Sequence, residues 1–178
     1  EVLKHRRENL TTFAEDYYHF LSKEVDIVGT SEKDLFRINR YNDSTKIEVY
    51  SLSSKKEKIK ELLYHRTFIN GETEEIRLYG LGDNDIFRIN GNGKKGTKLR
   101  LIGGKGRDQY TDSSHVAGLS KKTLIYDRFG KSTINKSKET RLRLRHNKEV
   151  YNYNRKQFKY NTTMPLLAFG YNVDDGIL

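Results

Sequence analysis

A short alternating segment that ends in glycine recurs along the chain, and this repeat limits the folds that the chain can adopt. Residues 25–29 (VDIVG) align with residues 76–80 (IRLYG), and residues 99–103 (LRLIG) follow 23 positions later. The alignment extends beyond the glycine and superimposes further identical pairs, namely Asp34 and Asp85, Phe36 and Phe87, Ile38 and Ile89, and Asn39 and Asn90. The predicted units begin at residues 25, 47, 76, 99 and about 123. The steps are about 22–24 residues apart from one of 29, which includes a polar insert at residues 53–58, and such a repeat predicts stacked supersecondary units.

Each unit contains two alternating runs of apolar and polar residues, which indicate strands with one buried face. One unit cannot bury its apolar face alone, whereas stacked units bury a continuous narrow core. We therefore predict a mainly β fold, a single-chain β-solenoid (β-helix-like) of about five coils. A β-sandwich or roll with coincidental spacing is the alternative. The solenoid places four side chains in one column of the core, Ile27, Leu78, Leu101 and Ile125. Arg77, one residue from Leu78, is expected to face outward.

The segments on either side of the repeats have different patterns. In residues 1–24, apolar residues that include Leu10, Phe13 and Tyr17 recur at three- and four-residue spacing, which predicts an amphipathic helix. Because an open terminal coil exposes unpaired backbone groups, we predict that this helix caps one end of the solenoid repeats at 25–135. Residues 136–163 are predicted to be basic-aromatic strands or a linker. Residues 164–178 are predicted to begin a β-barrel strand or a hairpin.

Composition excludes several classes of protein. The chain of 178 residues has no Cys, which excludes a disulfide scaffold, a zinc ribbon and a thiol enzyme. No apolar run reaches the ~18 residues of a membrane-spanning helix. The hydrophobic fraction of 34% is low, as expected of a fold with much surface for its core. The net charge of +10 suits an acidic partner without identifying one. The chain begins at Glu1 without a signal peptide, and we expect it to be a piece of a longer protein.

The turns between predicted strands offer a candidate calcium site. Residues 103–111 match the nonapeptide of calcium-binding RTX repeats, so Asp85 and Asp108 are candidate calcium ligands. RTX units recur every nine residues, however, and Lys105 and Arg107 place positive charge beside the site. The favoured interpretation is structural, with the two aspartates capping turn amides and glycines supplying positive φ. The turn glycines are Gly29, Gly80, Gly82, Gly103, Gly104 and Gly106. No cofactor other than calcium is expected.

A basic stretch near the end of the repeats is the candidate contact for an acidic ligand. Arg141, Arg143 and Arg145 alternate with Leu142 and Leu144, and tyrosines follow. Such a face could meet phosphates of nucleic acid, lipid or glycan. A solvated strand face near a membrane is favoured over a nucleic-acid site. No catalytic arrangement of Ser, His and Asp or of paired carboxylates stands out, so the segment is predicted not to be an enzyme.

Four segments (residues 24–30, 75–85, 100–106 and 170–176) resemble the middle of long bacterial outer-membrane proteins. In that family a calcineurin-like metallophosphoesterase domain comes first and a C-terminal barrel of the surface-antigen (Bam/Tam) type comes last. The resemblance covers most of the chain. It implies that the segment lies in the periplasm, with its own upstream domain and the downstream barrel as partners.

These observations together predict a non-enzymatic spacer that connects an upstream domain to an outer-membrane barrel. Two alternatives stay open. One is a calcium-ordered module that binds acidic polysaccharide or lipopolysaccharide phosphate, and the other is an accessory segment of the upstream metallophosphoesterase.

Overall fold

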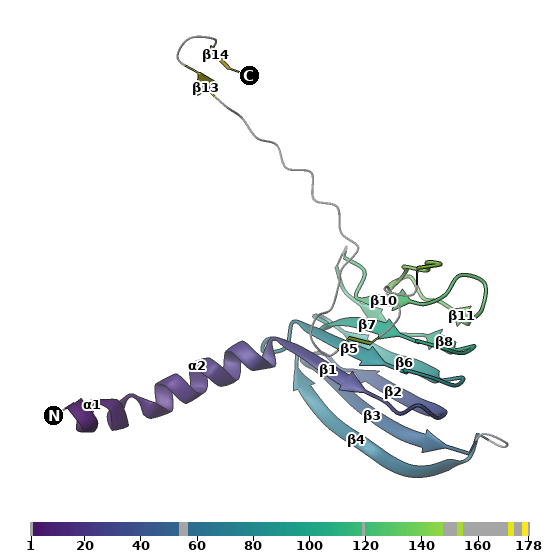
Figure 1. Ribbon diagram of the computed structural model, residues 1–178, viewed down its shortest axis with the longest axis horizontal. Coiled ribbons are helices and arrows are strands. Elements are labelled where there is room, and N and C mark those ends of the chain that lie inside the picture. The colour runs from purple at the N-terminus through teal and green to yellow at the C-terminus, as the bar shows by residue number, and fades with distance from the viewer. Residues whose placement is uncertain are drawn as a thin grey trace.

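The computed structural model describes residues 2–53, 57–118, 120–147, 153–154, 171–172 and 176–177. It is mainly β, as the alternating pattern predicts, with two short helices at the start of the chain (Figure 1). The helices are α1 (Val2–Glu8) and α2 (Leu10–Ser22). No helix in this described part of the chain is both long and apolar enough to cross a bilayer.

One sheet, the parallel sheet, has five strands in the order β1-β5-β7-β10-β12. Its strands are β1 (Glu24–Val28), β5 (Glu75–Tyr79), β7 (Lys98–Ile102), β10 (Thr123–Tyr126) and β12 (Thr140–Leu142). All neighbouring pairs in it are parallel.

The second sheet, the mixed sheet, has the order β11-β8-β6-β2-β3-β4, with a short strand β9 beside β6. Its strands are β2 (Asp34–Arg40), β3 (Ser44–Leu52), β4 (Ile59–Ile69), β6 (Ile86–Gly93), β8 (Gln109–Asp112), β9 (His115–Val116) and β11 (Thr133–Asn135). Pairing is parallel from β11 to β2 and antiparallel from β2 to β4. A separate antiparallel pair, β13 (Tyr171–Asn172) and β14 (Gly176–Ile177), lies where the sequence predicts a hairpin.

Equivalent residues of the sequence repeat pair with one another in the register of the parallel sheet. Ile27 pairs with Leu78, Leu78 with Leu101, and Leu101 with Ile125. All four side chains are at most 4% exposed and belong to one hydrophobic cluster, which also contains Phe36 and other side chains of the mixed sheet. The predicted column is therefore confirmed, and the two sheets share one core.

The prediction that a repeat unit begins at Ile47 is wrong. Ile47 lies in β3, which runs antiparallel to β2 in a hairpin rather than beginning another parallel unit. The hairpin forms because Asn42 and Asp43 make a tight turn, in which the Tyr41 amide donates to the Ser44 carbonyl. Antiparallel strands alternate with the same period of two as parallel ones, so periodicity alone cannot separate them.

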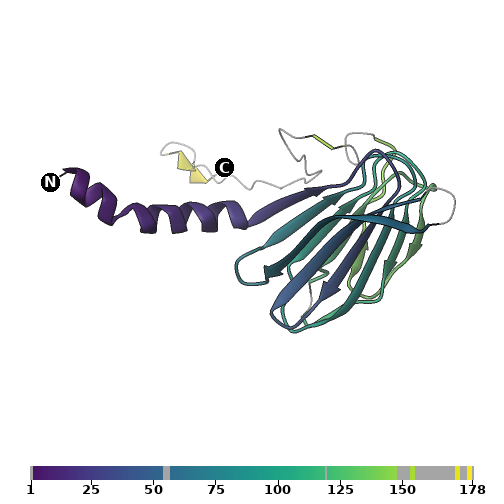
Figure 2. The same ribbon diagram turned by 90° about the horizontal axis from the view of Figure 1, so that it is seen from below.

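The β3–β4 hairpin covers the core beyond β1 and β2. Val49 of β3 and Phe68 of β4 are buried in the shared core, and Tyr64 packs against it. Figures 1 and 2 show β4 curving past the edge of the stacked strands. This insertion takes the role that the sequence assigns to the N-terminal helix.

The predicted helix is present but does not cap the core. It projects away from the sheets (Figures 1 and 2), and Leu10, Phe13 and Tyr17 are each 63% exposed. The apolar stripe is therefore unpacked in this chain. An amphipathic pattern shows which face of a helix prefers to be buried, but does not show what buries it.

Arg77 faces outward as expected, yet it is buried. Its guanidinium forms ion pairs with Glu24, Asp26 and Glu75, and only 8% of the residue is exposed. Glu75 also pairs with Arg100 of β7 at 2.8 Å. The outer face of the parallel sheet is thus bound together by charged side chains from successive strands.

Candidate functional site

Four turns stack along one edge of the molecule, which we call the turn face. They span residues 29–34, 80–85, 103–108 and 127–132, and each joins a strand of the parallel sheet to a strand of the mixed sheet. Strand register places equivalent positions of these turns beside one another, since Leu35 pairs with Ile86 and Ile86 with Gln109. Any residue type that recurs at one position of the turn therefore forms a row.

A row of buried aspartates holds successive turns together. Asp85 Oδ1 accepts a hydrogen bond of 2.8 Å from the Asp34 amide, and Asp108 Oδ1 accepts one of 2.9 Å from the Asp85 amide. All three residues have no exposed surface. The structure thus places both candidate calcium ligands as acceptors of turn amides. Among the described residues, no three His, Asp or Glu side chains form a group that could hold a metal ion.

The turn glycines have two different physical roles. A Cβ on Gly29, Gly80 or Gly103 would lie within 3.0 Å of the aspartate carboxylate in the same turn. These glycines have no positive φ, so the predicted reason for them is wrong: they make room for the carboxylate.

Positive φ explains only two of the six predicted turn glycines. Gly104 and Gly106 have φ of 97° and 143°, as expected. Their counterparts in the preceding turn, Leu81 and Asp83, have φ of 73° and 65° although they have side chains. Gly82 has no positive φ, and a Cβ there would lie 3.3 Å from the Ser31 carbonyl oxygen, a tight contact with the first turn and not with an aspartate carboxylate.

In the fourth turn, the aspartate stands at the first position of the turn instead of the last. Asp127 stands where the other turns have glycine, and Ser132 stands where they have aspartate. The buried Asp127 carboxylate accepts hydrogen bonds from the Tyr110 hydroxyl, at 2.8 Å, and from the Ser132 hydroxyl. A carboxylate is therefore retained inside this turn although it comes from the opposite side.

Burial makes the carboxyl groups of Asp85 and Asp108 weak acids by raising their pKa values. It raises the pKa of Asp85 to about 9, and the nearby carboxylates of Asp108, Asp34 and Asp83 act in the same direction. Burial likewise raises the pKa of Asp108 to about 8, with a further contribution from Asp127. A protonated carboxyl is a poorer ligand for a hard cation than an ionised one.

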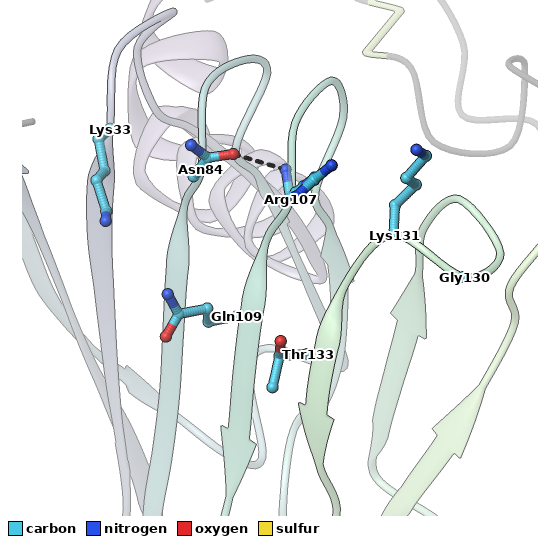
Figure 3. A pocket seen from close by; sticks show the side chains of 7 residues that line it. All are labelled: Lys33, Asn84, Arg107, Gln109, Gly130, Lys131 and Thr133. Atoms are coloured by element: carbon cyan, nitrogen blue, oxygen red, sulfur yellow. Dashed lines mark hydrogen bonds between the residues drawn. The ribbon is translucent and has the colours of Figure 1, made fainter.

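Outside this row lies an open groove of about 560 Å³. Each turn contributes one residue to the rim of this groove, the residue immediately before the aspartate or, in the fourth turn, before Ser132. In chain order these rim residues are Lys33, Asn84, Arg107 and Lys131. Gln109 and Thr133 line the groove between them from β8 and β11 (Figure 3). Sequence reasoning considered Arg107 only as an obstacle to calcium and did not connect it with Lys131. The signal available was their shared position in the repeat.

The cations of the rim differ in their pairing. Lys33 is buried and pairs with Glu57 at 2.7 Å. Arg107 and Lys131 are exposed, and neither forms an ion pair with any residue that the structure describes. The Arg107 amide donates to Asn84 Oδ1 at 2.8 Å, which connects the second and third turns at the groove (Figure 3).

The predicted arginine stretch is divided between two surfaces. Arg145 is paired with Arg128 by an isolated parallel bridge and extends the turn face beyond the fourth turn. Arg141 is exposed on β12, and Arg143 is half-buried after it. Of the three, the structure therefore brings only Arg145 into the turn face. The tyrosines at 151 and 160 lie outside the described residues.

No protein-family model, curated protein or solved structure matches this chain. The resemblance to outer-membrane proteins therefore stays a prediction.

Gly103→Ala should destabilise the fold by ~1–3 kcal/mol, because its Cβ would overlap the buried Asp108 carboxylate. The control is Gly71→Ala, where a Cβ meets nothing within 4 Å. Urea unfolding of both variants measures the difference. Equal effects would contradict the packing role of the glycine row.

Stability should fall as pH rises, in contrast to a protein dominated by ion pairs. Asp85 has a folded pKa of about 9 against a usual value of 3.8, so the folded state binds the extra proton between those values. The melting temperature should therefore fall from about pH 5 to about pH 9. Asp85→Asn imitates the neutral carboxyl and should flatten this fall, whereas the exposed Asp16→Asn should not. Identical profiles for all three proteins would refute the assignment.

Proposed function

We propose that this chain is a non-enzymatic β-solenoid spacer, which holds an upstream domain at a set distance from an outer-membrane barrel. The observation that supports it most is the unbroken register of Ile27, Leu78, Leu101 and Ile125 across the parallel sheet. A stack built in this way has a length set by its number of coils, at ~4.8 Å per coil.

The order of strands supports winding. Each passage through a stacked turn joins β1 to β2, β5 to β6, β7 to β8 and β10 to β11. The first strands of these pairs (β1, β5, β7, β10) and the second strands (β2, β6, β8, β11) lie in the same spatial order in their two sheets. Apart from the β3–β4 hairpin, the chain therefore moves on by one strand position in both sheets each time it passes through a stacked turn. This arrangement is expected of a chain that coils around one axis.

Contacts between successive coils favour a mechanical role. Asp85 and Asp108 connect neighbouring turns, and Glu75 connects β5 to β7 through Arg100. At the opposite corner, Arg40 is 2% exposed and donates to the Thr97 carbonyl at 2.9 Å and to Thr123 Oγ1 at 3.1 Å. Such cross-links resist separation of the coils, which a spacer needs.

The resemblance supplies the proposed location, the periplasm of a bacterial cell envelope. The antiparallel pairing of Tyr171 with Ile177 is compatible with a hairpin ahead of a barrel. The calcium-ordered alternative would require the weakly acidic Asp85 and Asp108 to ionise. The phosphoesterase alternative would be favoured over the spacer if the isolated chain hydrolysed a phosphate ester.

Removal of one whole coil tests the solenoid. Deleting residues 99–122 joins Lys98 to Thr123, which keeps Leu78 in register with Ile125. We expect a cooperatively melting protein with a lower melting temperature, since one set of nearest-neighbour contacts is lost. The control deletes only residues 99–110, which puts the later strands out of register and should unfold the chain. Circular dichroism distinguishes them, and two unfolded proteins would overturn the solenoid.

Protease access tests the location. Gly71 lies in an exposed turn with open space around it, so a protease site inserted after it should be tolerated. In bacteria that make the parent protein, we expect cleavage only after the outer membrane is made permeable. Cleavage in intact cells would place the segment outside the cell and contradict the periplasmic spacer.

A further inference from the structure

We propose that the turn face binds an acidic glycan, with Arg107 and Lys131 contacting its carboxylate or phosphate groups and the polar side chains of the same groove contacting its hydroxyls. This binding activity goes beyond the spacer role and does not depend on it.

Charge is distributed unevenly along the turn face. The first two turns have exposed acids, Glu32 and Asp83. The later turns and the segment beside them have exposed cations only, at Lys105, Arg107, Arg128, Lys131 and Arg145. The acids in those turns, Asp108 and Asp127, have no exposed surface and accept hydrogen bonds inside the fold. Positive charge at this end of the turn face is thus not balanced at the surface.

These five cations form no ion pair with any residue in the described part of the chain. Coils in register lie ~4.8 Å apart, so side chains of like charge are held close together. The resulting positive potential favours an anion that spans several coils. A linear polyanion satisfies this condition better than a single small ion.

The groove indicates what kind of polyanion fits. Beside the two cations, the groove is lined by the amide groups of Asn84 and Gln109 and the hydroxyl of Thr133 (Figure 3). Neutral amides and hydroxyls donate to and accept from hydroxyl groups, as a sugar chain requires. The guanidinium of Arg107 can hold a carboxylate or phosphate through two parallel hydrogen bonds.

Nucleic acid fits the same surface less well. Binding of single strands depends on aromatic side chains on which bases stack. Among the described residues that line the groove, none is aromatic. Phe129 of the fourth turn is exposed but does not line the groove, and its ring lies 5.6 Å from that of His146.

The test measures binding of defined oligosaccharides to the 178-residue chain by calorimetry at near-physiological salt. The probes are oligogalacturonate, which has carboxylates, a phosphorylated oligomannose of equal length, and neutral maltohexaose. We expect binding of at least one acidic probe and none of the neutral one. The double variant Arg107→Gln/Lys131→Gln should raise its Kd at least ~10-fold, because two charge-assisted contacts are lost. The stronger acidic probe identifies the preferred anion.

The control is Lys136→Gln/Lys138→Gln, which removes two exposed cations away from the turn face. The Kd of this control for the acidic probe should stay near that of the unchanged chain. Both double variants should have the melting temperature of the unchanged chain, since exposed side chains contribute little to stability. Equal losses in the two double variants would mean attraction by net charge alone and overturn the site. Absence of acidic-probe binding, or tighter binding of an oligothymidylate with the same dependence on Arg107 and Lys131, would overturn the glycan assignment.

Discussion

The hydrogen bond from one turn's backbone amide to the next turn's aspartate is the interaction on which the stack depends. Backbone groups inside a tight turn have no strand partner, and leaving them buried without one is costly. Asp85 and Asp108 satisfy the amides at positions 34 and 85 from the adjacent turn. The glycine row follows from this, because the carboxylate occupies the space that a Cβ would take. The exchange of the two positions at Asp127 and Ser132 shows that the turn needs a carboxylate in its interior more than it needs a given sequence.

The ends of the stack face a different constraint. A strand at the end of the stack leaves apolar contacts unmade on one side, and some other element must supply them. At the β1 end the chain supplies this element from within, because the β3–β4 hairpin extends the mixed sheet and places Phe68 against the shared core. At the other end Leu142 continues the register of Ile125 but is 37% exposed, as a terminal position would be. The core is therefore closed more fully at one end than at the other.

The repeat made the register predictable because a parallel stack puts equivalent residues directly beside one another. Leu78 and Leu101 could be paired from sequence for that reason alone. The hairpin at Ile47 could not be predicted, since its alternation satisfies a parallel and an antiparallel strand equally. The helix was predictable as a helix, but its partner was not, because the stripe at Phe13 and Tyr17 contains no information about the surface it contacts. The glycines at positions 29, 80 and 103 were identified from the sequence, but the reason predicted for them was wrong. A position that needs positive φ and a position without space for a Cβ both require glycine, so the sequence cannot distinguish the two.

Acid and base are separated within the same turns. The carboxyls of Asp85 and Asp108 point inward, where burial weakens their acidity and an amide of the preceding turn donates to each of them. Arg107 and Lys131, each next to the position of the buried residue, point outward and have no ion pair among the described residues. An ion pair between Arg107 and the adjacent Asp108 would remove the Asp108 carboxylate from the Asp85 amide, and one between Lys131 and Asp127 would remove the Asp127 carboxylate from the Tyr110 and Ser132 hydroxyls. The fold therefore maintains an exposed positive charge that it cannot neutralise with its own nearest acids, and this is the physical reason to look for an anion outside the chain.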